Sequence, residues 1–131
     1  MIKKFMCDKA DSESVNWVDE NNRLVGFDFS RQCCEQFGYK YCKFDFDAEA
    51  ECIENGCWSS INVFDDIDAV DNPDLSDAHF ADVQPFAENG KFKIEGSPDC
   101  NWLILYNHHS GYYYHGFVFK KDEKVVCKGD L

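Results

Sequence analysis

Four short apolar segments separated by turn-forming residues occupy the last third of the sequence. They are KFKIE after Gly90, then NWLILYN, HGFVFKK and EKVVCK, and the residues between them are GSPD, a histidine-rich stretch and KDE. Short segments rich in β-branched and aromatic residues, bounded by Gly, Pro, Asn and Asp, are typical of strands joined by turns. The C-terminal third is therefore predicted to form an antiparallel meander.

Strands are also predicted nearer the N-terminus. In SVNWVDENNRLVGFDFS, the polar residues Asp19–Asn22 separate two apolar segments, and Leu24–Phe29 alternates with a period of two. This pattern predicts a β-hairpin. The next segment, FGYKYCKFDF, alternates in the same way and predicts a further strand, and Ser60–Phe64 is a brief strand candidate.

Helix signals are confined to the middle of the chain. The segment DAEAECIENG has Asp47 as a candidate N-cap, acidic residues in its first turn, and Asn55-Gly56 as a C-terminal stop. Asn72-Pro73 can begin a second helical turn, and Pro85 closes the region. One or two short helices are therefore predicted beside the acidic loops.

A length of 131 residues suits one domain that buries its own core. The predicted fold is mainly β (α+β), a single compact antiparallel sheet or sandwich over residues 1–131. The acidic segment 44–90 is expected as an insert between the N-terminal hairpin and strand and the C-terminal meander.

The stretch YNHHSGYYYHGF, Tyr106–Phe117, is predicted to contain a hairpin turn at His108–Gly111. In that register Trp102 pairs with Phe117, and both faces of the hairpin are apolar, which predicts a central hairpin covered on both sides. One predicted face carries Trp102, Ile104, Tyr106, Tyr113, His115 and Phe117. On that face His115 is surrounded by aromatic rings, and a neutral imidazole with one hydrogen bond is favoured over a metal ligand.

The negative charge is concentrated in one window. The chain has 25 acidic and 13 basic residues, a net charge of -12, and no Lys or Arg lies between Lys43 and Lys91. Residues 44–90 carry a charge of -13, whereas the rest of the chain is close to neutral. This balance argues against direct binding to nucleic acid or to anionic membranes.

Three interpretations of the acidic window are open. One is a solvated face that keeps the protein soluble, and another is a surface that attracts a basic partner and speeds association with it. A calcium loop is the third, because Asp66, Asp68, Asn72 and Asp74 have nearly EF-hand spacing. That pattern fails in detail, since it needs a glycine at Asp71 and a bidentate glutamate at Asp77.

The eight cysteines contain no C-x-x-C pair, and the four histidines do not form the paired spacing of zinc modules. The N-terminal sequence MIKKFMCDKADSES lacks the apolar segment of a signal peptide or a membrane span, so the protein is expected in the cytoplasm. There the cysteines are expected to be reduced thiols packed in the core.

No catalytic motif is present. In FSRQCCEQFGY the two adjacent cysteines point to opposite faces of a strand, and Arg31 and Glu35 would shift a thiol pKa in opposite directions. Gly-rich phosphate loops and nucleophile elbows do not occur. The protein is predicted not to be an enzyme and to need no cofactor or metal.

Two segments together, FDFSRQCCEQFGY and NWLILYNHHSGYYYHGFVF, resemble a family of small uncharacterised domains of bacteriophages and bacteria. The likeness lies in the strand ending in CCE and in the downstream aromatic strand with its GYY turn. The chain departs from the family pattern at Gln32 and in its long acidic insert. The resemblance implies a phage or bacterial origin, and it brings no catalytic residues.

The leading functional hypothesis is a non-enzymatic, phage-encoded binding protein that presents its acidic surface to a basic, nucleic-acid-binding host protein as a nucleic-acid mimic. The predicted loop contacts are His108 and His109. The predicted partner-binding residues are Asp45, Asp47, Glu49, Glu51, Glu54, Asp65, Asp66, Asp68, Asp71, Asp74, Asp77 and Asp82. One alternative is a metal-binding or small-ligand-binding protein that uses His108, His109 and His115 with nearby cysteines or tyrosines. A phage structural or assembly component is the other.

Overall fold

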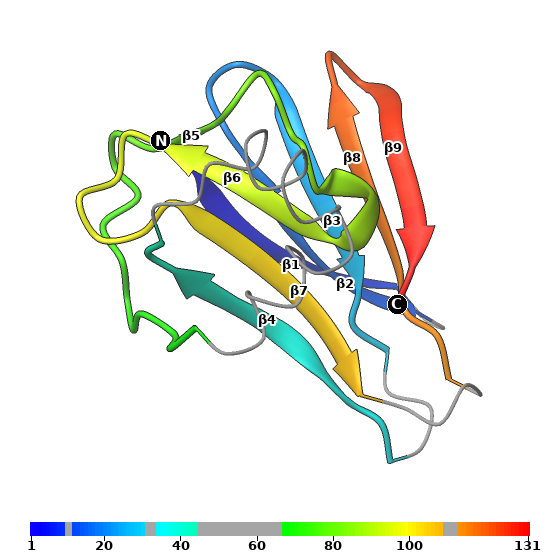
Figure 1. The fold of residues 1–131 in the computed structure, drawn as a ribbon. Helices are drawn as coiled ribbons and strands as arrows, with labels where there is room; N and C mark the ends of the chain where they lie inside the picture. The colour runs from blue at the N-terminus through cyan, green and yellow to red at the C-terminus, as the bar shows by residue number, and fades with distance from the viewer. Residues whose placement is uncertain (10–11, 31–33, 45–66, 109–112) are drawn as a thin grey trace.

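The computed structural model describes residues 1–9, 12–30, 34–44, 67–108 and 113–131, and these residues form two antiparallel sheets that pack face to face (Figure 1). One sheet has five strands in the order β1-β2-β3-β8-β9, and the other has four in the order β4-β7-β6-β5. The strands are β1 (Lys3–Lys9), β2 (Ser12–Val18), β3 (Arg23–Asp28), β4 (Gln36–Cys42), β5 (His79–Phe80), β6 (Lys91–Glu95), β7 (Trp102–His108), β8 (Gly116–Lys121) and β9 (Lys124–Asp130).

The predicted hairpin around Asp19–Asn22 is confirmed. Strands β2 and β3 pair antiparallel on either side of this turn, and Asn22 has the positive φ, 59°, that tight turns often require. Val15 and Trp17 alternate with polar residues along β2, and both are fully buried. The period-two pattern therefore marks the face that points toward the second sheet.

Strand β1 was not anticipated from the sequence. Lys3–Lys9 pairs antiparallel with β2 and forms one edge of the five-stranded sheet. Phe5 is 40% exposed and Met6 is 53% exposed. The apolar residues of β1 therefore do not alternate with polar ones in the way that would indicate a buried face. An edge strand with lysines and exposed side chains lacks the pattern that identifies a half-buried strand.

The main core lies between the two sheets, and both sheets contribute aromatic rings to it. Strand β7 is buried on both faces, because Leu103 and Leu105 point into this core, whereas Trp102 and Ile104 belong to a second cluster. The main core includes Val15, Trp17, Val25, Phe27, Phe80, Phe92, Ile94, Leu103, Leu105, Phe117 and Phe119. The second cluster includes Cys42, Phe86, Trp102 and Ile104. The predicted two-sided burial of this strand is therefore confirmed.

The predicted hairpin between β7 and β8 is wrong, and with it the expectation of a continuous meander. Strand β7 pairs with β4 and β6, whereas β8 pairs with β3 and β9 in the other sheet. Trp102 and Phe117, predicted to be paired on one face, belong to different clusters. The chain passes from one sheet to the other between these strands. Their apolar side chains are therefore not cross-strand neighbours, and those that touch do so across the core between the sheets.

Helical structure in the described residues is limited to one short 3-10 helix, Ala87–Asn89, which ends at Gly90 in the left-handed conformation. Asp71 and Asn72 form a bend and residues 73–75 have no regular structure, so the helical turn predicted at Asn72-Pro73 is wrong. The helix predicted from Asp47 and the strand predicted at Ser60–Phe64 lie outside the described residues. The mainly β class is confirmed. No helix within the described ranges has the length and apolar character needed to cross a bilayer.

Candidate functional site

Four of the predicted contact residues lie on one described segment, residues 67–77. Asp68, Asp71, Asp74 and Asp77 are all exposed, and no Lys or Arg occurs from residue 67 to residue 90. With Asp99, which contacts Asp74, they are called the acidic rim below. The other predicted contacts Asp45, Asp47, Glu49, Glu51, Glu54, Asp65 and Asp66 lie outside the described residues.

Backbone hydrogen bonds fix the rim segment against the sandwich. The amide of Val70 donates to the carbonyl of Tyr41 on β4 at 2.7 Å, and the amide of Ile2 donates to the carbonyl of Leu75 at 3.1 Å. The side chain of Leu75 packs against the main core. The segment is therefore held on its inner side, and its aspartates point to solvent.

Asp74 and Asp99 join the rim segment to the turn between β6 and β7. The amide of Asp74 donates to the Asp99 carboxylate at 2.7 Å, and the Ser97 hydroxyl donates to the Asp74 carbonyl at 2.7 Å. Hydrogen bonds from the Ser76 hydroxyl and then the Ser76 amide hold the pKa of Asp74 below its usual value. Asp74 is therefore ionised at neutral pH.

Asp99 was not among the predicted contacts because it lies beyond the basic-free window. Its only sequence signal is the turn GSPD, which was assigned to the meander. The contact with Asp74 spans 25 residues and depends on how the rim segment returns to the sandwich. Charge counting along the chain does not detect such a neighbour.

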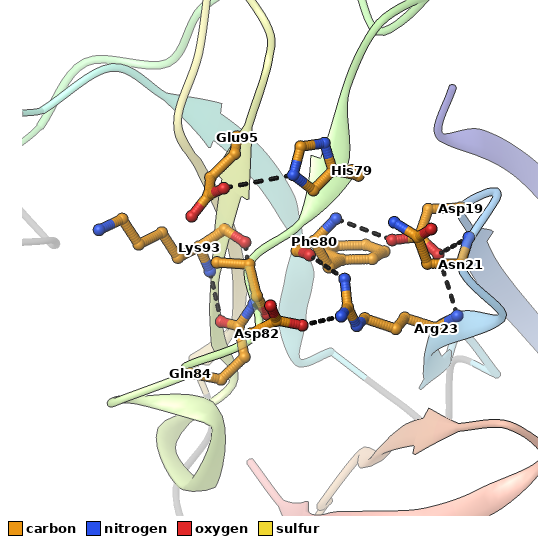
Figure 2. A network of polar contacts seen from close by, with 10 residues as sticks. Asp19, Asn21, Arg23, His79, Phe80, Asp82, Gln84, Lys93 and Glu95 are labelled. Atoms are coloured by element: carbon orange, nitrogen blue, oxygen red, sulfur yellow. Dashed lines mark hydrogen bonds and ion pairs between the residues drawn. The ribbon is translucent and has the colours of Figure 1, made fainter.

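Asp82 has different surroundings from the rim aspartates. Figure 2 shows its carboxylate in an ion pair with the guanidinium of Arg23, which also donates to the Phe80 carbonyl at 2.7 Å. Arg23 is 8% exposed and follows the β2–β3 turn, where Asp19 is buried as well. The charge of Asp82 is therefore compensated, and its predicted contact with a partner remains a prediction.

The histidines of the tyrosine-rich stretch are placed in different environments. His108 is exposed at the end of β7, its ring 5.6 Å from that of Tyr106, and His109 lies outside the described residues. His115 is fully buried and stacks on Phe37 with a centroid separation of 3.9 Å. The structure therefore does not place His108 and His115 on one accessible surface.

His115 confirms the prediction of a core histidine among aromatic rings. Its Nδ1 donates to the Asp28 carbonyl at 2.8 Å, which places a proton on that nitrogen. Its Nε2 lies 3.8 Å from a carboxylate oxygen of Glu35, which is 2% exposed. The sequence did not predict this partner, because the two residues are 80 positions apart and precede strands of different sheets.

The His115–Glu35 pair joins the two sheets at the end of the sandwich. Both side chains are buried, so a substrate in solvent does not reach either of them. Among the described residues, no group of three or more His, Cys, Asp or Glu side chains has an arrangement that could hold a metal ion. The pair is best described as an internal polar contact between the sheets.

No family model, curated protein or solved structure matches this chain. The resemblance to small phage and bacterial domains therefore remains a prediction.

The described cysteines differ in burial. Cys42 and Cys100 are buried, which confirms the prediction of core thiols for these two. Cys34 is exposed, so the prediction is wrong for this residue. Burial is the main factor that raises the pKa of the Cys42 and Cys100 thiols. Cys33, Cys52 and Cys57 lie outside the described residues.

Cys42 and Cys100 should react slowly with iodoacetamide in the folded protein, and Cys34 should react faster than either of them. A raised pKa leaves less thiolate at about pH 8, and burial blocks the reagent as well. Mass spectrometry of tryptic peptides after a short pulse measures each rate. The same pulse in denaturant should make the three rates similar. Equal labelling of Cys42 and Cys34 in the folded protein would contradict the burial described here.

Proposed function

We propose that this protein is a non-enzymatic binding protein that presents the acidic rim to a basic surface of a partner protein. The supporting observation is the arrangement of the rim: exposed carboxylates on a segment whose backbone is bonded to β4, to the N-terminus and to the β6–β7 turn. A fixed backbone reduces the conformational entropy that the partner contact would otherwise cost.

The charge of the rim supports the interpretation of a surface that attracts a basic partner over that of a face that only keeps the protein soluble. The rim has five aspartates, and the described lysines that contact it are Lys40 and Lys43, which donate to the Ile67 and Pro98 carbonyls. The excess of carboxylates produces a negative potential that raises the encounter rate with a basic surface. Hydrogen bonds from Ser76 hold the pKa of Asp74 below its usual value, so this carboxylate of the rim is charged in the neutral range. The rim therefore has the charge and the attachment expected of a recognition surface.

The partner class that fits is a nucleic-acid-binding protein. Such proteins carry clusters of Lys and Arg that neutralise phosphates, and a series of carboxylates on a fixed segment can occupy the same cluster. In this proposal the protein acts as a nucleic-acid mimic in the cytoplasm. An inhibitor of a host-defence nuclease, encoded by a phage, is the form of the proposal that agrees with the resemblance noted in the sequence.

Reversing the charge of Asp68, Asp71 and Asp77 to lysine should abolish partner binding. These three positions leave Asp74 and Asp99 in place, so the bonds that attach the rim are preserved. Affinity capture from a bacterial lysate at about 50 mM and about 500 mM salt, with quantitative mass spectrometry, measures the effect. Partners of the rim should be captured at low salt, released at high salt and lost from the triple variant.

The matched control reverses Asp8, Asp122 and Glu123, which are exposed outside the rim. It changes the net charge by the same amount, so it separates a rim contact from a general effect of charge. The proposal fails if both triple variants capture the same proteins as the unmodified chain. It also fails if both lose them equally.

A further inference from the structure

A groove of about 690 Å³ lies on the outer face of the five-stranded sheet, across β2, β3, β8 and β9. These four strands are neighbours in Figure 1. Trp17, Phe27 and Phe117 point inward from this sheet, so the alternate residues Asn16, Gly26 and Val118 point outward and line the groove. The groove is thus on the face opposite the core.

Two glycines on adjacent strands line the groove. Gly26 is paired between Asn16 and Val118, and a Cβ atom there would lie 2.9 Å from the Asn16 amide oxygen and 3.2 Å from a Val118 methyl group. Gly116 on β8 is paired with Asp130 on β9. On its other side β8 pairs with β3, and because Phe117 faces Phe27 there, the residue of β3 nearest Gly116 is Asp28. The side chains of Asn16 and Val118 therefore lie over Gly26, and an Asp130 carboxylate oxygen would lie 3.3 Å from a Cβ atom on Gly116, so that these neighbours shape the floor of the groove.

Carboxylates flank the space above Gly116. Asp28 and Asp130 both line the groove on strands either side of that glycine, which places their backbones about 10 Å apart, two strand spacings. An oxygen of Asp28 accepts a hydrogen bond from the Ser30 amide at 3.0 Å, which fixes the orientation of that side chain. Both carboxylates therefore border the same end of the groove.

We propose that this groove binds an arginine side chain presented by a partner protein. The aliphatic stem lies along Val118, and the guanidinium lies at the end of the groove that Asp28 and Asp130 line. A guanidinium donates hydrogen bonds from several edges of one plane, so it can contact two separate carboxylates, whereas an ammonium is a compact point charge. Apolar atoms dominate the groove surface, which suits the stem.

The groove is open to solvent, so a side chain can enter it while the backbone of the partner protein stays outside. The proposal does not rest on the acidic rim, since the groove residues belong to β2, β3, β8 and β9 and the rim residues to segment 67–77 and the β6–β7 turn. Lys128 also lines the groove, two residues before Asp130 on β9. Its charge opposes a bound cation and directs the guanidinium toward the aspartates.

The test is an NMR titration of the full-length protein with a blocked pentapeptide that has a central arginine flanked by glycines. Saturable shifts are expected at the amides of Gly26, Gly116 and Val118. A peptide with citrulline in place of arginine keeps the shape but has a carbonyl oxygen in place of one guanidinium nitrogen, so it loses the charge and two of the five N–H donors, and it should bind at least about fivefold more weakly. Equal binding of the two peptides would contradict the charge recognition.

Variants locate the site. Asp28→Asn combined with Asp130→Asn should weaken binding about fivefold, and Lys128→Gln should strengthen it. Asp28→Asn retains a side-chain oxygen that can accept the Ser30 hydrogen bond, and the unligated spectrum shows directly whether each variant is folded. The control pair, Asp122→Asn with Glu123→Gln, removes the same charge from the β8–β9 turn and should leave the affinity unchanged.

Three results would overturn the proposal. The first is an absence of saturable shifts at Gly26 and Gly116 with the arginine peptide. The second is an equal loss of affinity in the groove pair and in the control pair. In the third, agmatine, a free small guanidinium compound, binds in the groove and the peptide does not, which would assign the groove to a small molecule.

Discussion

Replacing Asp19 by alanine should lower the free energy of unfolding by about 3 kcal/mol. The carboxylate is 6% exposed, and it accepts hydrogen bonds from three backbone amides. One oxygen accepts from Asn21 and Arg23, both at 3.0 Å, and the other accepts from Phe80 at 2.9 Å. Alanine leaves these donors without an acceptor, and those of Arg23 and Phe80 are buried.

The Phe80 hydrogen bond explains why the effect should be large. Asp19 lies in the turn between β2 and β3 of one sheet, whereas Phe80 lies on β5 of the other, so this carboxylate connects the two sheets (Figure 2). Arg23 reinforces the connection by donating to the Phe80 carbonyl. Loss of Asp19 therefore weakens the contact between sheets as well as the turn.

Urea unfolding followed by tryptophan fluorescence measures the change, since Trp17 and Trp102 are buried. Asp19→Asn keeps one oxygen for the turn but places an amide donor against the Phe80 amide, so an intermediate loss is expected. The exposed Asp71→Ala variant should change stability by less than about 0.5 kcal/mol. A similarly small loss for Asp19→Ala would mean that water replaces the carboxylate and that the connection between sheets does not depend on it.

Local patterns identified most of the strands but not their partners. The hairpin at Asp19–Asn22, strand β4 and the strands of the C-terminal third all follow from alternation and turn residues, which act over a few positions. The pairing of β7 with β4, and of β8 with β3, is decided by which faces meet in the core. A turn between two apolar strands has the same sequence signals whether the strands pair or separate into two sheets. No residue near the turn therefore indicates that β7 and β8 do not pair.

In the candidate site too, local features were predictable from the sequence and contacts between distant residues were not. Exposure of Asp68 and Asp71 was predictable, because a dense group of aspartates without counter-charges is costly to bury. The ion pair of Asp82 with Arg23, and the contact of Asp99 with Asp74, join residues 59 and 25 positions apart. The groove was not predicted either, since Gly26 and Gly116 become neighbours only when β3 pairs with β8.

Replacing Gly96 by alanine should cost about 3 kcal/mol of stability and disturb the acidic rim. Gly96 has a φ of 88°, which L-residues rarely adopt, and a Cβ atom there would overlap the backbone carbonyl oxygen of Asp77. A backbone atom cannot rotate away as a side chain can. The segment that carries Asp77 must therefore move outward from the β6–β7 turn.

Gly90→Ala provides the matched comparison. Gly90 also has a positive φ, 74°, but its nearest contact would be a terminal methyl group of Leu131 at 3.0 Å, which can shift. Thermal or urea unfolding should show a loss of about 1 kcal/mol for Gly90→Ala, the conformational penalty alone, and the larger loss for Gly96→Ala. Only Gly96→Ala should also weaken capture of a rim-dependent partner, because it displaces Asp77 and strains the bond from Ser97 to Asp74. If the two variants lose equal stability, the rim segment does not pack on the turn as described, and the pre-organisation on which the proposed function depends is lost with it.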